Sequence, residues 1–259
     1  MADPPLAGVR VLVTRPRRQA AALVEAVEAA GGEAIRFPVI EITPRDRTAI
    51  EADVRRLTNP DICVFVSANA VRHGLDFAGE ARLAAIGPAT AAAVESLGRT
   101  VDIQPAKGYA SEQLLAEPEL AEVAGKTVRI VRGGDGRELL ATELERRGAR
   151  IEYLSVYERR LPSVASRALD AVTKALISGK IAAIVVMSVQ SLDNLLRLLP
   201  EAAHDALCRS ALVTPSERVI KVLLHRHPDW RATLAHGPQA GDLVAALVTV
   251  IRSKPGKAE

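Results

Sequence analysis

Short apolar runs alternate with amphipathic segments along the whole chain, and this alternation is the main structural signal in the sequence. The runs are rich in Val, Ile, Leu and Ala, as is typical of buried strands. We predict ten strands, at Val9–Thr14, Ile35–Ile42, Ile62–Val66, Leu83–Gly87, Val101–Ile103, Val128–Val131, just after Gly148, and at Ile181–Met187, Ala211–Thr214 and Ala232–Ala235. Strands that alternate with helices predict an α/β protein with doubly wound, parallel sheets in a flavodoxin-like order.

The segments between the strands repeat their apolar residues at helical spacing. Leu23, Val24 and Val27 would face inward in a helix over Gln19–Ala30, and Gly31 and Gly32 would end it. Further helices are predicted at Thr48–Leu57, Leu139–Arg147 and Ala165–Ile177.

An internal repeat relates the two halves of the chain. The order strand, turn, helix, glycine, strand and extended tail starts at Val9 and again at Lys126, and Gly32 falls where Gly148 falls. The later strands correspond as well, because one ends in Ser67 and its counterpart ends in Ser188. The chain therefore contains two units of five strands each.

Two assignments of these strands to domains fit the repeat. In the first, the domains are consecutive and meet near Glu122–Lys126. In the second, the first strand–helix–strand joins the C-terminal half, and the chain crosses between domains twice, through Pro38–Arg45 and Val156–Ser163. Both crossings contain proline and are extended, which favours the second assignment, although periodicity leaves both open.

The composition is that of a soluble globular protein. Of the 259 residues, 48% are hydrophobic and 25% charged, and the net charge is +3. Aromatic residues make up only 3%, which argues against a reader of single-stranded nucleic acid, because such proteins stack bases on aromatic rings. The start of the sequence is unlike a signal peptide and no apolar run is long enough to cross a membrane, so we expect a cytoplasmic protein.

Several kinds of site are not supported by any motif. The glycines of Gly133–Gly136 do not have the spacing of a dinucleotide-binding loop, and a phosphate-binding Walker lysine is missing. Cys63 and Cys208 are far apart, and the five histidines form no set with metal-ligand spacing. We therefore expect neither a flavin nor a metal site.

Small polar residues and glycines follow the predicted strands. In parallel sheets ligands bind at the carboxyl ends of the strands, where helix N-termini offer free N–H groups to anions. The same residue types also serve as ordinary helix caps and turns. The candidate binding residues at these ends are Thr14, Arg15, Ser67, Ala68, Asn69, Gly87, Thr90, Ser111, Gly133, Gly134, Arg137, Ser188, Pro215 and Ser216.

The segment from Lys126 to Pro162 combines a glycine turn with an unusual tail. Its strand leads into Gly133 and Gly134, and a helix and a second strand follow. The tail then contains Tyr157 in a cluster of charged residues, which is uncommon for a core strand. Tyr157 is the candidate for proton transfer, and a packed tyrosine with a hydrated hydroxyl is the alternative.

These residues resemble the uroporphyrinogen-III synthase family, which closes the tetrapyrrole ring. The resemblance extends over nearly the whole chain and is carried by VLVTRP, FVSANAV, AAIGPATAAAVESLG and the YASEQLL stretch. The most specific signal is RGGDGRELLATELERRGA followed by VYERRLP. The C-terminal half is less similar, since Met187 and Ser188 stand where the family often has Thr-Ser.

The resemblance implies a fold and a reaction. It implies two flavodoxin-like domains, 1–38 with 164–259 and 46–155, joined by a two-stranded antiparallel ribbon of 39–45 and 156–163. It also implies that hydroxymethylbilane loses water and closes with inversion of ring D, through a spiro intermediate, without a cofactor or metal. The bilane would lie between the domains, bound mainly by backbone N–H groups, and Tyr157 would assist departure of the hydroxyl as an acid.

Other classes of protein fit the same fold. A two-domain module that binds or senses an anionic metabolite without catalysis is the main alternative, and a flavin electron carrier is a third. For the enzyme we expect a monomer with a small-molecule substrate and no nucleic-acid or membrane partner.

Overall fold

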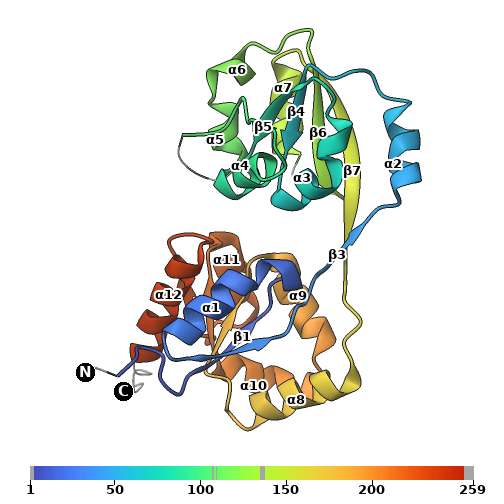
Figure 1. Ribbon diagram of the computed structural model, residues 1–259. Helices are drawn as coiled ribbons and strands as arrows, with labels where there is room; N and C mark the ends of the chain where they lie inside the picture. The colour runs from blue at the N-terminus through green and yellow to red at the C-terminus, as the bar shows by residue number, and fades with distance from the viewer. Residues whose placement is uncertain (1–2, 107, 109, 135–137, 254–259) are drawn as a thin grey trace. The chain divides into compact units, whose positions relative to one another are not determined.

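The computed structural model describes residues 3–106, 108, 110–134 and 138–253, and the chain divides into two compact units. Unit 1 contains Met1–Glu41 and Arg160–Glu259, and unit 2 is the continuous segment Ile42–Arg159. Each unit is built on a five-stranded sheet flanked by helices (Figure 1). The prediction of an α/β fold with two doubly wound sheets is thereby confirmed.

The sheet of unit 1 is parallel throughout. Its strands are β1 (Arg10–Val13), β2 (Glu33–Arg36), β8 (Ala183–Val185), β9 (Ala211–Thr214) and β10 (Ala232–Leu234). Their spatial order is β10-β9-β8-β1-β2, so the strand that comes first in the chain lies inside the sheet, between β8 and β2. Counted along unit 1, this is the flavodoxin-like order 2-1-3-4-5.

Helices on both sides complete unit 1. They are α1 (Ala21–Ala29), α8 (Ser166–Ile177), α9 (Val189–Leu198), α10 (His204–Arg209), α11 (Glu217–Arg226) and α12 (Ala240–Arg252), with short 3₁₀ turns η1 (Arg17–Gln19) and η3 (Glu201–Ala203). Helices α1 and α12 lie side by side on one face of the sheet (Figure 1). Leu23 and Leu247 from these helices pack against Val11 and Val185, so this face of the core is aliphatic.

The sheet of unit 2 repeats four positions of this order and has an additional strand at one edge. Its strands are β3 (Glu41–Pro44), β4 (Ile62–Phe65), β5 (Arg82–Ala85), β6 (Thr127–Gly133) and β7 (Arg150–Arg160). The spatial order is β3-β7-β6-β4-β5, and the pairs among β4 to β7 are parallel. Each sheet thus joins the first two strands of one repeat to the later strands of the other.

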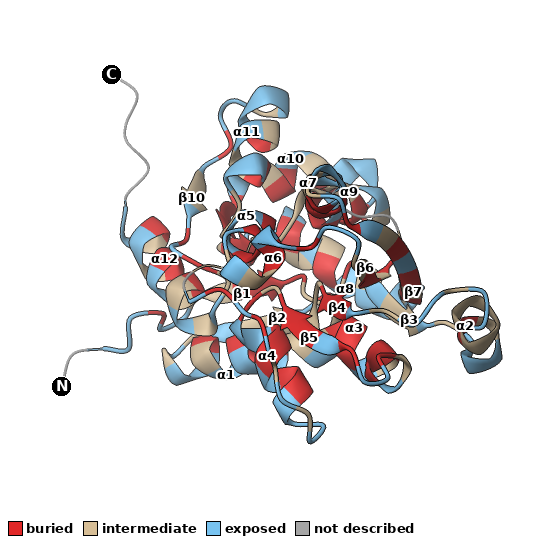
Figure 2. Ribbon diagram, turned by 90° about the horizontal axis from the view of Figure 1, so that it is seen from above, coloured by how far each residue is buried: buried red, intermediate tan, exposed pale blue. Residues whose placement is uncertain are grey.

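The helices of unit 2 cover two separate apolar clusters. They are α2 (Arg47–Val54), α3 (Ala68–Gly74), α4 (Pro88–Glu95), α5 (Ser111–Leu115), α6 (Pro118–Ala121) and α7 (Leu139–Arg146), with the 3₁₀ turn η2 (Leu75–Phe77). Cys63 and Phe65 of β4 face the cluster that includes α3 and α4, while Ile62 and Val64 face α5 and α7. This alternation is expected of a strand buried on both faces. Figure 2 shows β4 and much of α3 as buried, and α2 as mostly more exposed.

Two strand predictions were wrong in detail. Val101–Ile103 forms no strand, because only Ile103 makes a bridge, to Ala84, and the carboxylate of Asp102 accepts the N–H of Leu83 at 2.7 Å. The predicted run Ile35–Ile42 is interrupted by Phe37–Ile40, so β2 and β3 belong to different sheets. Proline at position 38 has no N–H for a sheet ladder, which explains the interruption.

Strand β7 is longer than a core strand needs to be, and it is bulged. Residues Arg132 and Ser155 are paired, but the next pair is Gly133 with Tyr157, so one extra residue, Val156, is inserted. Leu154, Val156 and Tyr157 consequently all belong to one core cluster, which the two-residue alternation of a regular strand does not allow. The tail predicted after this strand is in fact part of it as far as Arg160.

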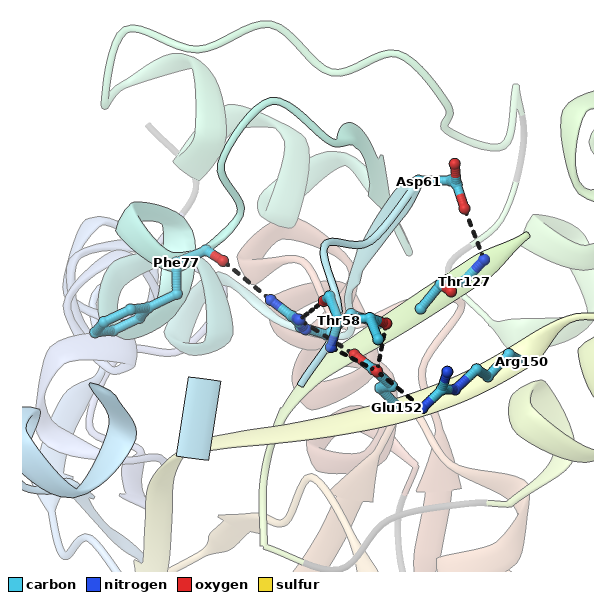
Figure 3. A network of polar contacts seen from close by, with 7 residues as sticks. Thr58, Asp61, Phe77, Thr127, Arg150 and Glu152 are labelled. Carbon is cyan, nitrogen blue, oxygen red and sulfur yellow. Dashed lines mark hydrogen bonds and ion pairs between the residues drawn. The ribbon is translucent and has the colours of Figure 1, made fainter. Parts of the chain in front are cut away.

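A buried ion pair joins β6 to β7 near the start of both strands. Arg129 and Glu152 are 3.1 Å apart, and their side chains are only 2% and 5% exposed. The carbonyls of Thr58 and Phe77 accept hydrogen bonds from the guanidinium, and Thr58 donates to Glu152 through its N–H and hydroxyl (Figure 3). Burial by itself raises the pKa of Glu152, but these hydrogen bonds outweigh it and hold the pKa below 4.5.

Candidate functional site

The hydroxyl of Tyr157 lies in a polar contact at the carboxyl end of the unit 2 sheet. It is 3.1 Å from Oγ of Ser67, and a guanidinium nitrogen of Arg159 donates to it at 3.4 Å. The side chain is fully buried, with the ring of His73 nearby at a centroid distance of 6.3 Å. The sequence indicated Tyr157 as a proton donor but gave no sign of its partners.

Gly133 makes room for the ring of Tyr157. A Cβ atom built on Gly133 would lie 2.1 Å from Cε2 of that ring, far inside contact distance. The glycine predicted as part of an anion-binding turn therefore has a packing role as well. Gly134 differs, because its φ of +56° favours glycine while its surroundings are open. Arg137, predicted beside them, lies outside the described residues.

Ser67 caps α3 and contacts the tyrosine with the same oxygen. Its Oγ accepts the N–H of Ala70 at 3.1 Å, as expected of a serine N-cap. Ser67 is half-buried, whereas Tyr157 is not exposed at all. Of the two residues, only Ser67 therefore retains solvent-exposed surface.

The other predicted residues of unit 2 lie at the starts of helices. Ala68 and Asn69 begin α3, and Asn69 is buried and accepts a hydrogen bond from Arg72. Gly87 caps α4 with extended backbone, and the N–H of the buried Thr90 is bonded to its carbonyl. Ser111, also buried, is the first residue of α5. At the strand ends, these residues therefore offer mainly backbone groups rather than side chains.

A charged cluster adjoins the Gly133–Gly134 turn. The guanidinium of Arg132 lies 3.9 Å above the ring of Tyr153, and it also pairs with Glu138 at 3.4 Å. The hydroxyl of Tyr153 donates to the same carboxylate. Burial and the nearby Glu138 raise the pKa of Tyr153 to about 12, so it stays protonated at neutral pH. This cluster, which sequence reasoning missed, ties the start of α7 to strands β6 and β7.

In unit 1, Thr14 is a structural residue. Its buried hydroxyl donates to the carbonyl of Val185 at 2.7 Å, across 171 residues of sequence. Its own carbonyl accepts the N–H of Val39, whose carbonyl in turn accepts from the side chain of Asn194. The side chain of Thr14 thus joins β1 to β8, and its backbone carbonyl holds the segment after β2.

Arg15 follows directly and is the charged residue among the candidates of unit 1. It donates to the carbonyl of Pro238 at 3.1 Å, just before α12. Burial lowers its pKa from the ordinary value, and within the described part of the chain its Nε has no hydrogen-bond partner although that atom is buried. A carboxylate would supply both the charge and the acceptor that this guanidinium lacks.

Ser188, Pro215 and Ser216 lie at the starts of α9 and α11. Oγ of Ser188 accepts the N–H of Ser191 at 3.1 Å, so this serine caps α9 just as Ser67 caps α3. Ser216 is the N-cap of α11 without a side-chain cap bond, and its N–H donates to the hydroxyl of Thr214. The parallel strands β1, β8 and β9 bring all three residues and Arg15 to one edge of the sheet.

The described residues hold no cluster of three or more His, Cys, Asp or Glu side chains placed to bind a metal ion. Within the same ranges, the helices are too short or too polar to cross a membrane.

The fold and the strand-end residues define a two-domain α/β protein in which the unit 1 sheet has the flavodoxin-like order and the strands β7-β6-β4-β5 of unit 2 repeat its first four positions. A family model described as uroporphyrinogen-III synthase HemD matches residues 21–245. Relatives of that name from Salmonella typhimurium and Escherichia coli are 32% and 30% identical over 233 residues, which is 85% of this chain and 92% of each relative. The chain belongs to the uroporphyrinogen-III synthase family, and it is therefore a cyclising lyase of tetrapyrrole biosynthesis.

Solved structures agree on the fold. A mutant uroporphyrinogen III synthase from Thermus thermophilus matches with a TM-score of 0.62 at 21% identity, over 94% of this chain and 99% of the other. A uroporphyrinogen-III synthetase from Helicobacter pylori has the same TM-score at 12% identity, over 93% and 99% of the two chains.

Proposed function

We propose that the protein converts hydroxymethylbilane into uroporphyrinogen III, working as a monomer in the cytoplasm. The bilane loses water and closes with inversion of ring D. The observation that carries this proposal is the family match over residues 21–245. The strand ends support it, because they provide N–H donors and Arg15 for an acidic ligand.

The acetate and propionate groups of the bilane are the ligands for these strand ends. Gly87, Ser188 and Ser216 are the N-caps of α4, α9 and α11, and the first N–H groups of a helix have no partner within it. Each contact between a carboxylate and a helix N-terminus contributes about 0.3–1 kcal/mol at an exposed site. A substrate with many carboxylates gathers several such contributions.

Catalysis then depends on orientation and on one proton. Once the hydroxyl has left, the bilane is reactive and closes by itself to the isomer without inversion, so the protein must hold both ends in one geometry. Tyr157 supplies the proton for the departing hydroxyl. The segments 39–45 and 156–163 serve as a linker that lets the bodies 1–38 with 164–259 and 46–155 close on the substrate and exclude water.

The test is the isomer formed from synthetic hydroxymethylbilane. The products are oxidised to porphyrins and separated by chromatography, with and without the purified protein. We expect the type III isomer with the protein and the type I isomer without it. Equal proportions of the type I isomer in both samples would refute the proposed activity and leave a non-catalytic binding module as the better interpretation.

A further inference from the structure

We propose that Ser67 is the residue that delivers the proton to the departing hydroxyl, and that Tyr157 acts through it. This proposal rests on the proposed function and adds the route of the proton. It starts from a difference in exposure, since Tyr157 is fully buried and Ser67 is only half-buried. In the proposed arrangement the substrate therefore meets Ser67 rather than the buried tyrosine.

The hydrogen bonds around the pair allow a relay that runs from Tyr157 to Ser67. Arg159 has only donors, so the oxygen of Tyr157 accepts from it, and in the proposed relay the tyrosine O–H donates to Oγ of Ser67, 3.1 Å away, in a contact in which either hydroxyl can be the donor. Oγ of Ser67 also accepts the N–H of Ala70. With both acceptor positions of Ser67 filled, its own O–H is the one hydrogen of the relay that remains to be donated outward.

The step balances with these groups alone. The C–O bond of the hydroxymethyl group breaks, and its oxygen leaves as water with the proton of Ser67, while the electron pair of the pyrrole nitrogen replaces the lost bond. Ser67 takes the proton of Tyr157, and the guanidinium of Arg159 stabilises the tyrosinate. The methylene carbon then forms a C–C bond to ring D as the pyrrole nitrogen regains its electron pair. The ring carbon at which the macrocycle closes finally loses a proton, which restores Tyr157.

Gly133 and the bulge at Val156 hold the relay in place. The bulge turns Tyr157 toward α3, and the absent side chain at Gly133 lets the ring lie against β6. Ser67 is in turn fixed by its cap on α3. In this scheme Ser67 is the catalytic residue, and Tyr157 and Arg159 are positioning residues that act through it.

The test compares Ser67→Ala, Ser67→Thr, Tyr157→Phe and the Ser67→Ala/Tyr157→Phe double variant by kcat and KM for the type III isomer. We expect Ser67→Ala to lower kcat by about 10²-fold or more at nearly unchanged KM, since a positioned acid contributes that much. Ser67→Thr keeps the hydroxyl and should keep most of kcat. The double variant should be no slower than the slower single variant, because the two residues act as one unit.

A matched control separates the relay from the loss of a helix cap. Asp46 caps α2 by accepting the N–H of Ala49 at 3.0 Å, in the same unit, and it belongs neither to the candidate binding residues nor to the proposed relay. Asp46→Ala should cost a comparable free energy of unfolding, about 1 kcal/mol, and leave kcat unchanged. An unchanged kcat in Ser67→Ala, or rate losses that multiply in the double variant, would overturn the relay while the wild type still forms the type III isomer. A wild type that forms none would overturn the proposed function and the relay together.

Discussion

The ring of Tyr157 lies where a side chain at Gly133 would have to be. The Cβ atom that any other residue carries would lie 2.1 Å from Cε2 and 2.3 Å from Cζ of the tyrosine. The two residues are also direct partners in the ladder between β6 and β7, on the far side of the bulge. The glycine turn and the tyrosine in the strand after it are therefore parts of one packing arrangement.

Gly133→Ala should destabilise unit 2. The added methyl group must push the buried ring aside, and overpacking of this kind costs about 1–3 kcal/mol. Replacing Tyr157 by leucine in the same chain should recover part of that loss, whereas Tyr157→Phe should not, because phenylalanine keeps the ring. Urea unfolding followed by circular dichroism measures both effects.

Gly241→Ala is the matched control for that substitution. Gly241 lies in α12, its φ is not positive, and a Cβ built on it meets nothing within 4 Å. Alanine there should be neutral or stabilising by up to about 1 kcal/mol. Equal destabilisation by the two alanine variants would contradict the packing explanation.

Gly134→Val should weaken binding of the uroporphyrinogen III product, if the turn after β6 binds a carboxylate. Valine is strained at a φ of +56° and would change the direction of the N–H groups in the turn. Gly125→Val tests the same strain elsewhere, since Gly125 has a φ of +75° and open surroundings at the other end of β6. Titration calorimetry should show a larger dissociation constant for the first variant only. An identical constant in both would exclude the turn as a carboxylate site.

Breaking the buried ion pair should be costly. Glu152→Gln or Arg129→Met leaves the other group buried without its counter-charge, which typically costs about 3–5 kcal/mol. The exposed pair of Arg47 and Glu51 provides the comparison, since Glu51→Gln should change the free energy of unfolding by no more than about 1 kcal/mol. If both pairs had similar small effects in urea unfolding, burial would not be what makes Arg129–Glu152 important.

The same carboxylate should make stability depend on pH. Because the pKa of Glu152 is lower in the folded than in the unfolded chain, its contribution is fully present above the ordinary value of 4.5 and is lost as the pH falls. In the Glu152→Gln variant, the side chain at this position does not titrate. The difference in unfolding free energy between wild type and Glu152→Gln should therefore shrink from about pH 6 to about pH 3. A constant difference over that range would mean that Glu152 does not carry the effect.

Local patterns in the sequence were enough to predict most of the fold. Apolar periodicity and the glycines after helices located the strands, because these signals come from neighbouring residues. The assignment of Val101–Ile103 was wrong because a side chain, Asp102, occupies a ladder position that the pattern assigns to backbone. The long run divides near Pro38 because its two halves join different sheets. Local spacing carries no information about which sheet a strand joins.

The site was predictable as a region but not as a set of contacts. Residues at strand ends share an edge in any parallel sheet, so their grouping follows from the topology. The contact between Ser67 and Tyr157 joins residues 90 positions apart. It also depends on a one-residue bulge, and no residue type in the sequence predicts that bulge. The same holds for Thr14, whose bond to the carbonyl of Val185 joins residues 171 positions apart and gives this predicted binding residue a structural role as well.

The position of β1 between β2 and β8 has a consequence for biosynthesis. The hydroxyl of Thr14, which directly follows β1, can donate to the carbonyl of Val185 only after the ribosome has added a further 171 residues. At about 5–20 residues per second this takes roughly 10–30 s. Throughout that interval the apolar segment Val11–Val13 is already made, while the continuous segment Ile42–Arg159 emerges and can fold. The half of the protein that is begun first is thus finished last, and its earliest strand is the one most in need of protection on the nascent chain.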